Sequence, residues 1–220
     1  MPFGNRADAG QKLAAELAAY RHEQVTILAL PRGGVMVAAE IAGALTAPLD
    51  LILVRKVGVP FQPELAMGAV VDGTEPIIVR NHDVIAITGI SEEEFDSVCQ
   101  RELAEIERRR QRYLADRERA PIAEQVVIVV DDGIATGATM RAALQATRQR
   151  KPRKLVLAVP VAPTSTLQEL HSEADEIVCL EDHEDFGAIG YFYKDFRQVT
   201  DEEVIALLAR YPVPQERMSR

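Results

Sequence analysis

The sequence predicts an α/β fold with a mostly parallel central sheet that is covered by helices on both faces. Short apolar runs rich in valine and isoleucine alternate along the chain with stretches of helical spacing, which is the pattern that builds such a sheet. The 220 residues, 47% hydrophobic and 27% charged, are sufficient for one packed domain. We therefore expect residues 1–220 to form a single domain.

The first part of the chain is expected to alternate between helices and strands. The expected elements are helices at 7–21 and 35–46 and strands at 25–30 and 51–54. Residues 55–75 contain several glycines and prolines, so we expect mostly loop or short irregular strand there. Two weaker strands are expected within 76–88.

A long helix is expected over residues 91–119. Ser91 is followed three residues later by Glu94, which is the pattern of a capping box at a helix start. Apolar residues then recur at helical spacing and predict a buried stripe. The stripe consists of Phe95, Cys99, Leu103, Ile106 and Tyr113.

The second part of the chain repeats the alternation. The expected elements are strands at 126–130, 155–159 and 177–180 and helices at 139–150, 164–171 and 201–210. The run Val126–Val130 is apolar at every position, as in a central parallel strand that is buried on both faces.

The loop that follows this strand carries the strongest functional signal. It reads Asp131-Asp132-Gly133-Ile134-Ala135-Thr136-Gly137-Ala138-Thr139. Ligands of open α/β sheets bind at the carboxyl ends of the strands, and the N-terminus of a helix binds phosphate through its unpaired amides. Gly137 allows close approach of the backbone, and Thr136 and Thr139 add hydroxyl donors. The two aspartates suit hydroxyl groups or a divalent cation.

Other interpretations of this loop fit less well. A dinucleotide site would need a G-x-G-x-x-G pattern, and a P-loop would need a lysine after Gly137. Receiver domains also place paired acids after a strand, but they lack the Thr-Gly turn. A simple helix cap beside solvated acids would explain each residue but not their combination.

The run Val127–Thr139 resembles the diphosphoribosyl-binding signature of type I phosphoribosyltransferases, and the resemblance extends over most of the chain. It implies the fold of that family, with a small hood. It also implies that Asp131 and Asp132 contact the ribose hydroxyls, directly or through water and Mg²⁺. Residues Ala135, Thr136, Gly137, Ala138 and Thr139 would wrap the 5-phosphate. The helix at 91–119 is long for this fold, so we interpret it as an insertion that could pack on a partner subunit of a homo-oligomer.

Two further segments supply cations or amides at strand ends. Pro31-Arg32-Gly33-Gly34 falls between a strand and a helix, and the equivalent turn of the family holds pyrophosphate, often through an unusual peptide geometry. Alone, it would fit an ordinary turn equally well. Arg55 and Lys56 suit the same pyrophosphate and precede a stretch that could close over the site as a mobile loop. A solvated pair on a surface hairpin is the alternative, and Glu64 is a weaker candidate in that stretch.

Residues 181–196 hold many of the aromatic side chains of the chain. By the resemblance, this segment is expected to be the hood that holds the acceptor, with Phe186, Tyr191 or Tyr193 stacking on a flat base. A small satellite core is the alternative for each single ring.

The net charge of −9 argues against nucleic-acid and anionic-membrane partners, since both need a basic surface. Arg108, Arg109 and Arg110 follow glutamates at pairing distance on the same helix, so we expect a salt-bridged, solvated face there; the glutamates are Glu102, Glu105 and Glu107. The two lone cysteines and the lack of a long apolar segment predict a cytoplasmic protein.

The resemblance implies transfer of a 5-phosphoribosyl group from phosphoribosyl pyrophosphate to a small nitrogenous acceptor, expected to be a nucleobase, with Mg²⁺ as cofactor. No protein nucleophile is required. Transferases of 6-oxopurines carry an acid where this chain has Ala135, so the adenine or orotate type is favoured over guanine and hypoxanthine. Two alternatives remain open: a non-enzymatic sensor of phosphoribosyl pyrophosphate or a nucleotide, and an enzyme of this fold that runs hydrolysis or the reverse reaction.

Overall fold

A five-stranded parallel sheet forms the body of the molecule in the computed structural model, which describes residues 2–73, 75–115 and 117–213. The strands β1 (Val25–Ala29), β2 (Leu49–Leu51), β6 (Val126–Val130), β7 (Lys154–Pro163) and β8 (Glu176–His183) follow the order β2-β1-β6-β7-β8. Every neighbouring pair in this sheet is parallel. The predicted mostly parallel sheet is therefore confirmed.

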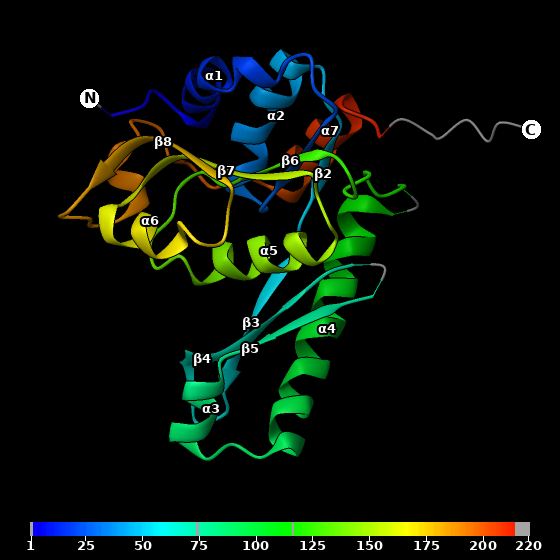
Figure 1. Ribbon diagram of the computed structural model, residues 1–220, viewed down its shortest axis with the longest axis vertical. Helices are drawn as coiled ribbons and strands as arrows, with labels where there is room; N and C mark the ends of the chain where they lie inside the picture. The colour runs from blue at the N-terminus through cyan, green and yellow to red at the C-terminus, as the bar shows by residue number, and fades with distance from the viewer. Residues whose placement is uncertain (1, 74, 116, 214–220) are drawn as a thin grey trace, which may run out of the picture.

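Helices cover both faces of this sheet (Figure 1). One layer contains α1 (Arg6–Glu16), α2 (Gly33–Leu45) and α7 (Asp201–Arg210), and the other contains α5 (Ala138–Gln149) and α6 (Thr164–Leu170). The central strand β6 serves both layers, because alternate side chains of a strand point to opposite faces. Ile128 packs in the cluster under α1 and α2, and Val127 and Val129 pack in the cluster under α5. This two-sided burial explains why the strand is apolar throughout.

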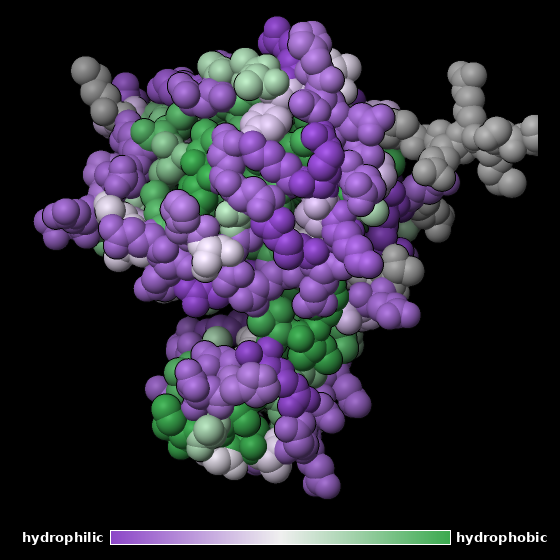
Figure 2. All heavy atoms as spheres, in the orientation of Figure 1, coloured by the Kyte–Doolittle hydropathy of each residue, from purple (hydrophilic) through white to green (hydrophobic). Residues whose placement is uncertain are grey.

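A second, antiparallel sheet forms an arm that projects from the body (Figure 1). It consists of β3 (Val54–Val59), β4 (Gln62–Val71) and β5 (Ile77–Arg80), followed by the short helix α3 (His82–Thr88). The long helix α4 (Glu92–Leu114) lies along β3 and β4 and returns the chain to the body. Figure 2 shows a face covered largely by hydrophilic side chains, with a hollow between arm and body.

The expectation of mostly loop or short irregular strand over 55–75 was wrong, because β3 and the ten-residue β4 form an antiparallel hairpin there, with a register shift at Gly58. Its glycines do not end the strands but lie where another part of the backbone comes very close. A Cβ at Gly58 would lie 2.4 Å from the Pro63 carbonyl oxygen, and one at Gly68 would lie 2.5 Å from that of Val79. The pairing register shifts at Gly58, as in a β-bulge. Composition alone cannot distinguish glycines that permit close packing within a hairpin from glycines in a loop.

Two other boundaries also differ from expectation. The predicted strand at 51–54 is divided, since β2 ends at Leu51 and β3 begins at Val54. Ile52 and Leu53, which lie between the two strands, are buried as well. The run 51–54 is therefore apolar at every position, and its sequence shows no break between the strands. Of the two strands expected within 76–88, the second is the helix α3, which is capped by the Asn81 side chain accepting from the Val84 amide at 3.2 Å.

The long helix begins as predicted but ends before residue 119. Ser91 and Glu94 form the expected capping box. The helix ends at Leu114, and the following arginines anchor the returning chain instead of continuing it. Arg117 donates to the backbone carbonyls of Leu49, Leu208 and Tyr211, and Arg119 pairs with the buried Asp72 at 2.8 Å. Two arginines expected within the helix therefore serve as tertiary anchors beyond its end.

Helix α7 matches its predicted range of 201–210 in full. Nowhere in the described ranges is there a helix with the length and apolar character required to cross a bilayer. Cys99 and Cys179 are both free thiols, and burial raises the pKa of each to about 11.

Phe95 is a fully buried contact between α4 and the antiparallel sheet, and its replacement by alanine tests how the arm is held. Its side chain is 1% exposed, lies beside Gly68 and is covered by the Arg80 guanidinium 4.2 Å from the ring centroid. We expect Phe95→Ala to lower the free energy of unfolding by about 3–5 kcal/mol, because it removes a large buried ring. Urea denaturation measures this loss. Hydrogen exchange should rise in β3, β4 and β5 before it rises in β6, and equal protection in both sheets would contradict this role.

Candidate functional site

Two loops meet at the carboxyl edge of the parallel sheet. Strands β1 and β6 pair in parallel, with Ala29 opposite Val130, and the Leu30 amide donates to the Val130 carbonyl at 2.9 Å. The turn at 31–34 and the loop at 131–139 therefore begin beside each other. The structure brings these two predicted segments together.

The glycines of the turn pack directly on the aspartates of the loop. A Cβ at Gly33 would lie 1.9 Å from Asp132 Oδ2, and a Cβ at Gly34 would lie 2.9 Å from the Asp131 Cα. Only hydrogen fits at these two positions without movement of the aspartates. The peptide bond between Pro31 and Arg32 is cis.

Asp132 is a buried anchor whose carboxylate is paired with a cation. Arg6 Nε lies 2.6 Å from Asp132 Oδ2, and both side chains are almost fully buried. The Tyr193 hydroxyl donates to the Asp132 carbonyl at 2.6 Å. Arg6 also donates to the Arg197 carbonyl at 2.9 Å, and its guanidinium carbon lies 3.9 Å from the centroid of the Phe196 ring. These contacts hold the loop between the first helix and the segment after β8.

Asp131 has a different environment. Its Oδ1 accepts from the Asp132 amide at 2.8 Å, and within the described ranges no cation forms an ion pair with it. Burial raises the pKa of the Asp131 carboxyl well above its usual range, and the negative charge of Asp132 raises that pKa further. The two aspartates looked equivalent in the sequence but have different roles. Asp132 is a structural anchor, whereas the ionised form of Asp131 would be stabilised by a bound cation or hydroxyl group.

The rest of the loop presents its backbone amides. Gly137, with a φ of 74°, is the N-cap of α5, and a Cβ there would lie 2.7 Å from Thr166 Cγ2. The Thr166 hydroxyl donates to the Ala135 carbonyl at 2.9 Å and braces the loop from α6. In the part of the chain that the structure describes, no hydrogen bond uses the amides of residues 135–139. The side chains of Ala135, Thr136, Ala138 and Thr139 are exposed.

A cavity of about 610 Å³ opens beside this loop, between the body and the arm. Thr136 and Ala138 form part of its wall on the body side, and Arg80 and His82 form part of its wall on the arm. The amide-bearing loop is thus open to ligands from solution.

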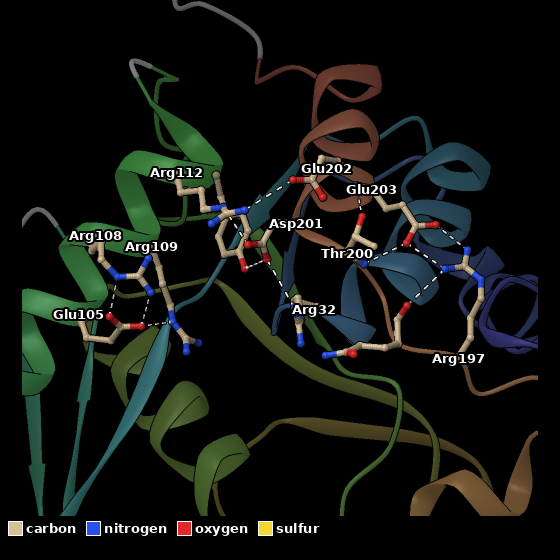
Figure 3. A network of polar contacts seen from close by, with 12 residues as sticks. Arg32, Glu105, Arg108, Arg109, Arg112, Arg197, Thr200, Asp201, Glu202 and Glu203 are labelled. Atoms are coloured by element: carbon tan, nitrogen blue, oxygen red, sulfur yellow. Dashed lines mark hydrogen bonds and ion pairs between the residues drawn. The ribbon is translucent and has the colours of Figure 1, made fainter.

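The cations predicted for the pyrophosphate are arranged differently from expectation. Arg55 pairs with Glu102 of α4 at 2.7 Å, and Lys56 pairs with Glu64 at 3.0 Å, both within the arm. Arg32, by contrast, points toward Asp201 at the start of α7, with 3.8 Å between Nη1 and Oδ1 (Figure 3). The structure therefore places Arg32 at the turn and gives Arg55 and Lys56 acidic partners elsewhere.

The aromatic segment packs against the same loop. Tyr193 is buried, with Phe3 and Phe196 on its ring, so it offers no open face to a base, and its predicted acceptor role does not fit this position. Phe186 stacks on Phe192 with 5.0 Å between ring centroids, whereas Tyr191 is 79% exposed. For Tyr193 the satellite-core alternative holds.

The model of the phosphoribosyl transferase domain family matches residues 4–196 of this chain. The chain belongs to the phosphoribosyl transferase domain family. In Mycobacterium tuberculosis, strain H37Rv, the protein named "Putative phosphoribosyl transferase Rv0571c" is 46% identical over 208 residues, which is 94% of this chain. A protein of strain CDC 1551 with a similar name, MT0597, gives the same identity and coverage.

This phosphoribosyl transferase domain spans 46% of the length of those curated relatives. Its fold also superposes on the crystal structure of TT1426 from Thermus thermophilus, with a TM-score of 0.84 and 41% identity. That alignment covers 96% of this chain and all of the other. The small antiparallel sheet of the arm fits the hood of such a fold, while β8 includes the first residues of the predicted hood at 181–196.

Sequence reasoning missed two residues that shape the site of this phosphoribosyl transferase domain. Arg6 lies in the first turn of α1, where a positive charge opposes the helix dipole, and this mismatch was the one local sign of a buried partner. Thr166 had no such sign, because a threonine early in a helix is ordinary.

The two aspartates should respond oppositely to neutralisation, and this is our prediction for the unliganded protein. The raised pKa of Asp131 means that its ionised form is disfavoured in the folded state. The resulting loss of stability is present above its folded pKa and disappears as pH falls to its unfolded value. Asp131→Asn should therefore raise the melting temperature at about pH 7, with a smaller gain at about pH 4.

Asp132→Asn is the matched control, since it leaves Arg6 buried without a charged partner. We expect it to lower the free energy of unfolding by about 3 kcal/mol. Thermal melts of both variants across pH measure these effects. A lower melting temperature for Asp131→Asn at neutral pH would refute the assignment.

Proposed function

We propose that this domain transfers the 5-phosphoribosyl group from phosphoribosyl pyrophosphate to a nitrogenous acceptor and releases pyrophosphate. The observation that carries the proposal is the row of unpaired amides at 135–139 beside the half-buried Asp131 and the buried Asp132. Unpaired amides at a helix N-terminus bind phosphate through direct hydrogen bonds and the positive end of the helix dipole.

The donor would span the two neighbouring loops. Its 5-phosphate would lie on residues 135–139, and its ribose hydroxyls would reach Asp131. The pyrophosphate would lie at the turn formed by Arg32, Gly33 and Gly34, whose position beside Asp131 supports this arrangement. A ligand with phosphates at both ends of a ribose matches the two separate amide-rich loops.

Mg²⁺ is the cofactor that the family implies, and the donor set here is compatible with it. The described residues contain no group of three or more His, Cys, Asp or Glu side chains arranged for a metal. Asp131 is a half-buried carboxylate at this loop for which the described residues supply no ion-pair partner, and Mg²⁺ commonly uses one or two carboxylates together with substrate phosphates. When bound, the ion would neutralise charge on the leaving pyrophosphate.

The reaction requires positioning and charge stabilisation more than covalent help from the protein. The bond between C1 of the ribose and the pyrophosphate oxygen breaks, and the pair of electrons leaves with pyrophosphate. The acceptor nitrogen forms the new bond to C1 and loses its proton to solvent or base. Fixing the donor on the two loops, with the acceptor held opposite C1, supplies much of the rate enhancement for such a step.

The acceptor is proposed to be a nucleobase other than a 6-oxopurine, because Ala135 stands where the enzymes for those bases carry an acid. Phe186 and Tyr191 remain the candidates for contact with it, and Tyr191 has the exposed ring. A cytoplasmic location and a homo-oligomer are proposed as well, and the free thiols support the former.

A thermal-shift experiment tests donor binding. With Mg²⁺ present, phosphoribosyl pyrophosphate at about a hundred times its dissociation constant should add about 2.7 kcal/mol of stability. Gly137→Ala should abolish most of this gain, because its methyl group would displace Thr166 and the loop. Gly89→Ala is the matched control: Gly89 also has a positive φ, of 67°, but a Cβ there meets nothing within 4 Å.

Both variants should lose about 1–2 kcal/mol of intrinsic stability from a positive φ at alanine, and Gly137→Ala should lose more because its methyl group also meets Thr166. Only Gly137→Ala should lose the ligand response. Equal responses in the two variants would contradict the phosphate site. Release of pyrophosphate on adding candidate bases then distinguishes a transferase from a sensor, which would bind the donor and release nothing.

A further inference from the structure

Four arginines converge on one cavity at the base of α4. The cavity has a volume of about 460 Å³ and is lined by Arg32, Arg108, Arg109 and Arg112, with Pro31, Tyr113 and Asp201 completing the wall. Figure 3 shows the three arginines of α4 facing the side on which Arg32 and Asp201 lie. We call these four residues the arginine pocket.

The helix places its arginines on one face. Arg108 and Arg112 are four residues apart, and Arg109 and Arg112 are three apart, so their side chains lie close on the helix surface. Contacts with α7 fix the orientation of this face. The Tyr113 hydroxyl donates to Asp201 Oδ1 at 2.6 Å, and Arg112 Nε lies 2.7 Å from Asp201 Oδ2. The pocket is therefore held by the packing of two helices.

The arginine pocket has more positive charge than its acidic neighbours balance. The lining contains four guanidinium groups and the Asp201 carboxylate, and Glu105 and Glu202 pair with its arginines from outside, so four positive charges face three negative ones in a chain with a net charge of −9. Glu105 is shared between Arg108 at 2.8 Å and Arg109 at 2.7 Å, and these contacts lower its pKa to about 2. Within the described ranges Arg109 bonds through Nε alone, which leaves its other N–H donors free. Closely spaced guanidinium groups with free donors suit an anion with several oxygens.

We propose that the arginine pocket binds the pyrophosphate end of the donor, and that α4 supplies the cations predicted for Arg55 and Lys56. This inference rests on the proposed function, and it assigns a role to the long helix. Pro31 and Arg32 belong both to the wall of the pocket and to the turn proposed for pyrophosphate, so the two sites are continuous. Arg55 and Lys56 pair with Glu102 and Glu64 within the arm, and neither lines the pocket. The salt-bridged face expected at 108–110 thus exists, but part of it lines a ligand cavity.

Calorimetric titration with inorganic pyrophosphate tests the pocket without the donor. Arg109→Gln should weaken pyrophosphate binding by about tenfold, because one charge-assisted contact is lost. Arg101→Gln is the matched control, an exposed arginine on the same helix that does not line the cavity. Glu105→Gln should instead tighten binding by several-fold, since it removes a negative charge that competes for Arg108 and Arg109. Glu107→Gln, which pairs with Arg110 outside the lining, should change nothing.

Poor folding could weaken pyrophosphate binding in Arg109→Gln, but it cannot explain tighter binding in Glu105→Gln. The second variant therefore keeps the test decisive even if the first is destabilised. Unchanged binding in Arg109→Gln, an equal loss in Arg101→Gln, or no binding of pyrophosphate by the unaltered protein would each overturn the inference.

A parallel titration separates this inference from the proposed function. Ribose 5-phosphate lacks the pyrophosphate, so its affinity should be the same in Arg109→Gln and in the unaltered protein, whereas the affinity for phosphoribosyl pyrophosphate should fall. Loss of both ligands in Arg109→Gln would overturn the pocket assignment. Failure of the unaltered protein to bind phosphoribosyl pyrophosphate, with arginine-dependent binding of inorganic pyrophosphate retained, would refute the transfer reaction and leave the pocket as a pyrophosphate site.

Discussion

The buried pair between Arg6 and Asp132 is the contact on which the arrangement of the site depends. It joins the first turn of α1 to the loop after β6, and Arg6 reaches on to the Arg197 carbonyl and the Phe196 ring. A buried ion pair is rarely a large net source of stability, because both charges lose their hydration. Its value here is positional: three segments distant in the sequence are fixed around one carboxylate. With Asp132 held in this way, Asp131 is left as the carboxyl that a ligand can stabilise.

The arm and its long helix extend the site outward from the sheet. The loops at 31–34 and 131–139 belong to the parallel body, whereas α4 approaches them from the side of β2 and β3. Phe95 holds the helix to the antiparallel sheet, and Tyr113 and Arg112 hold its other end to α7. One rigid rod therefore connects the tip of the arm to the charged face near Arg32. A shift of the arm would therefore also displace the arginines of that face.

The parts of the structure that could be predicted from the sequence are those specified by local chemistry. The strand Val126–Val130, the capping box at Ser91 and the Gly137 turn each depend on residues a few positions apart, and all three are present. The partners of the charged residues could not be predicted, because pairs such as Arg55–Glu102 and Arg6–Asp132 join distant parts of the chain. The glycines of the β3–β4 hairpin led to an incorrect prediction of loop for a related reason. Their role is set by a neighbouring strand that the local sequence does not reveal.

The close packing of Gly33 on Asp132 also limits how the site can change over generations. A Cβ at residue 33 would lie 1.9 Å from Asp132 Oδ2 and 3.0 Å from Arg6 Nε, so it would collide with both members of the buried pair. Replacing either charged residue alone would leave the other unpaired in the interior. Positions 6, 33 and 132 are therefore coupled, and a path of single substitutions away from this trio passes through a damaged intermediate.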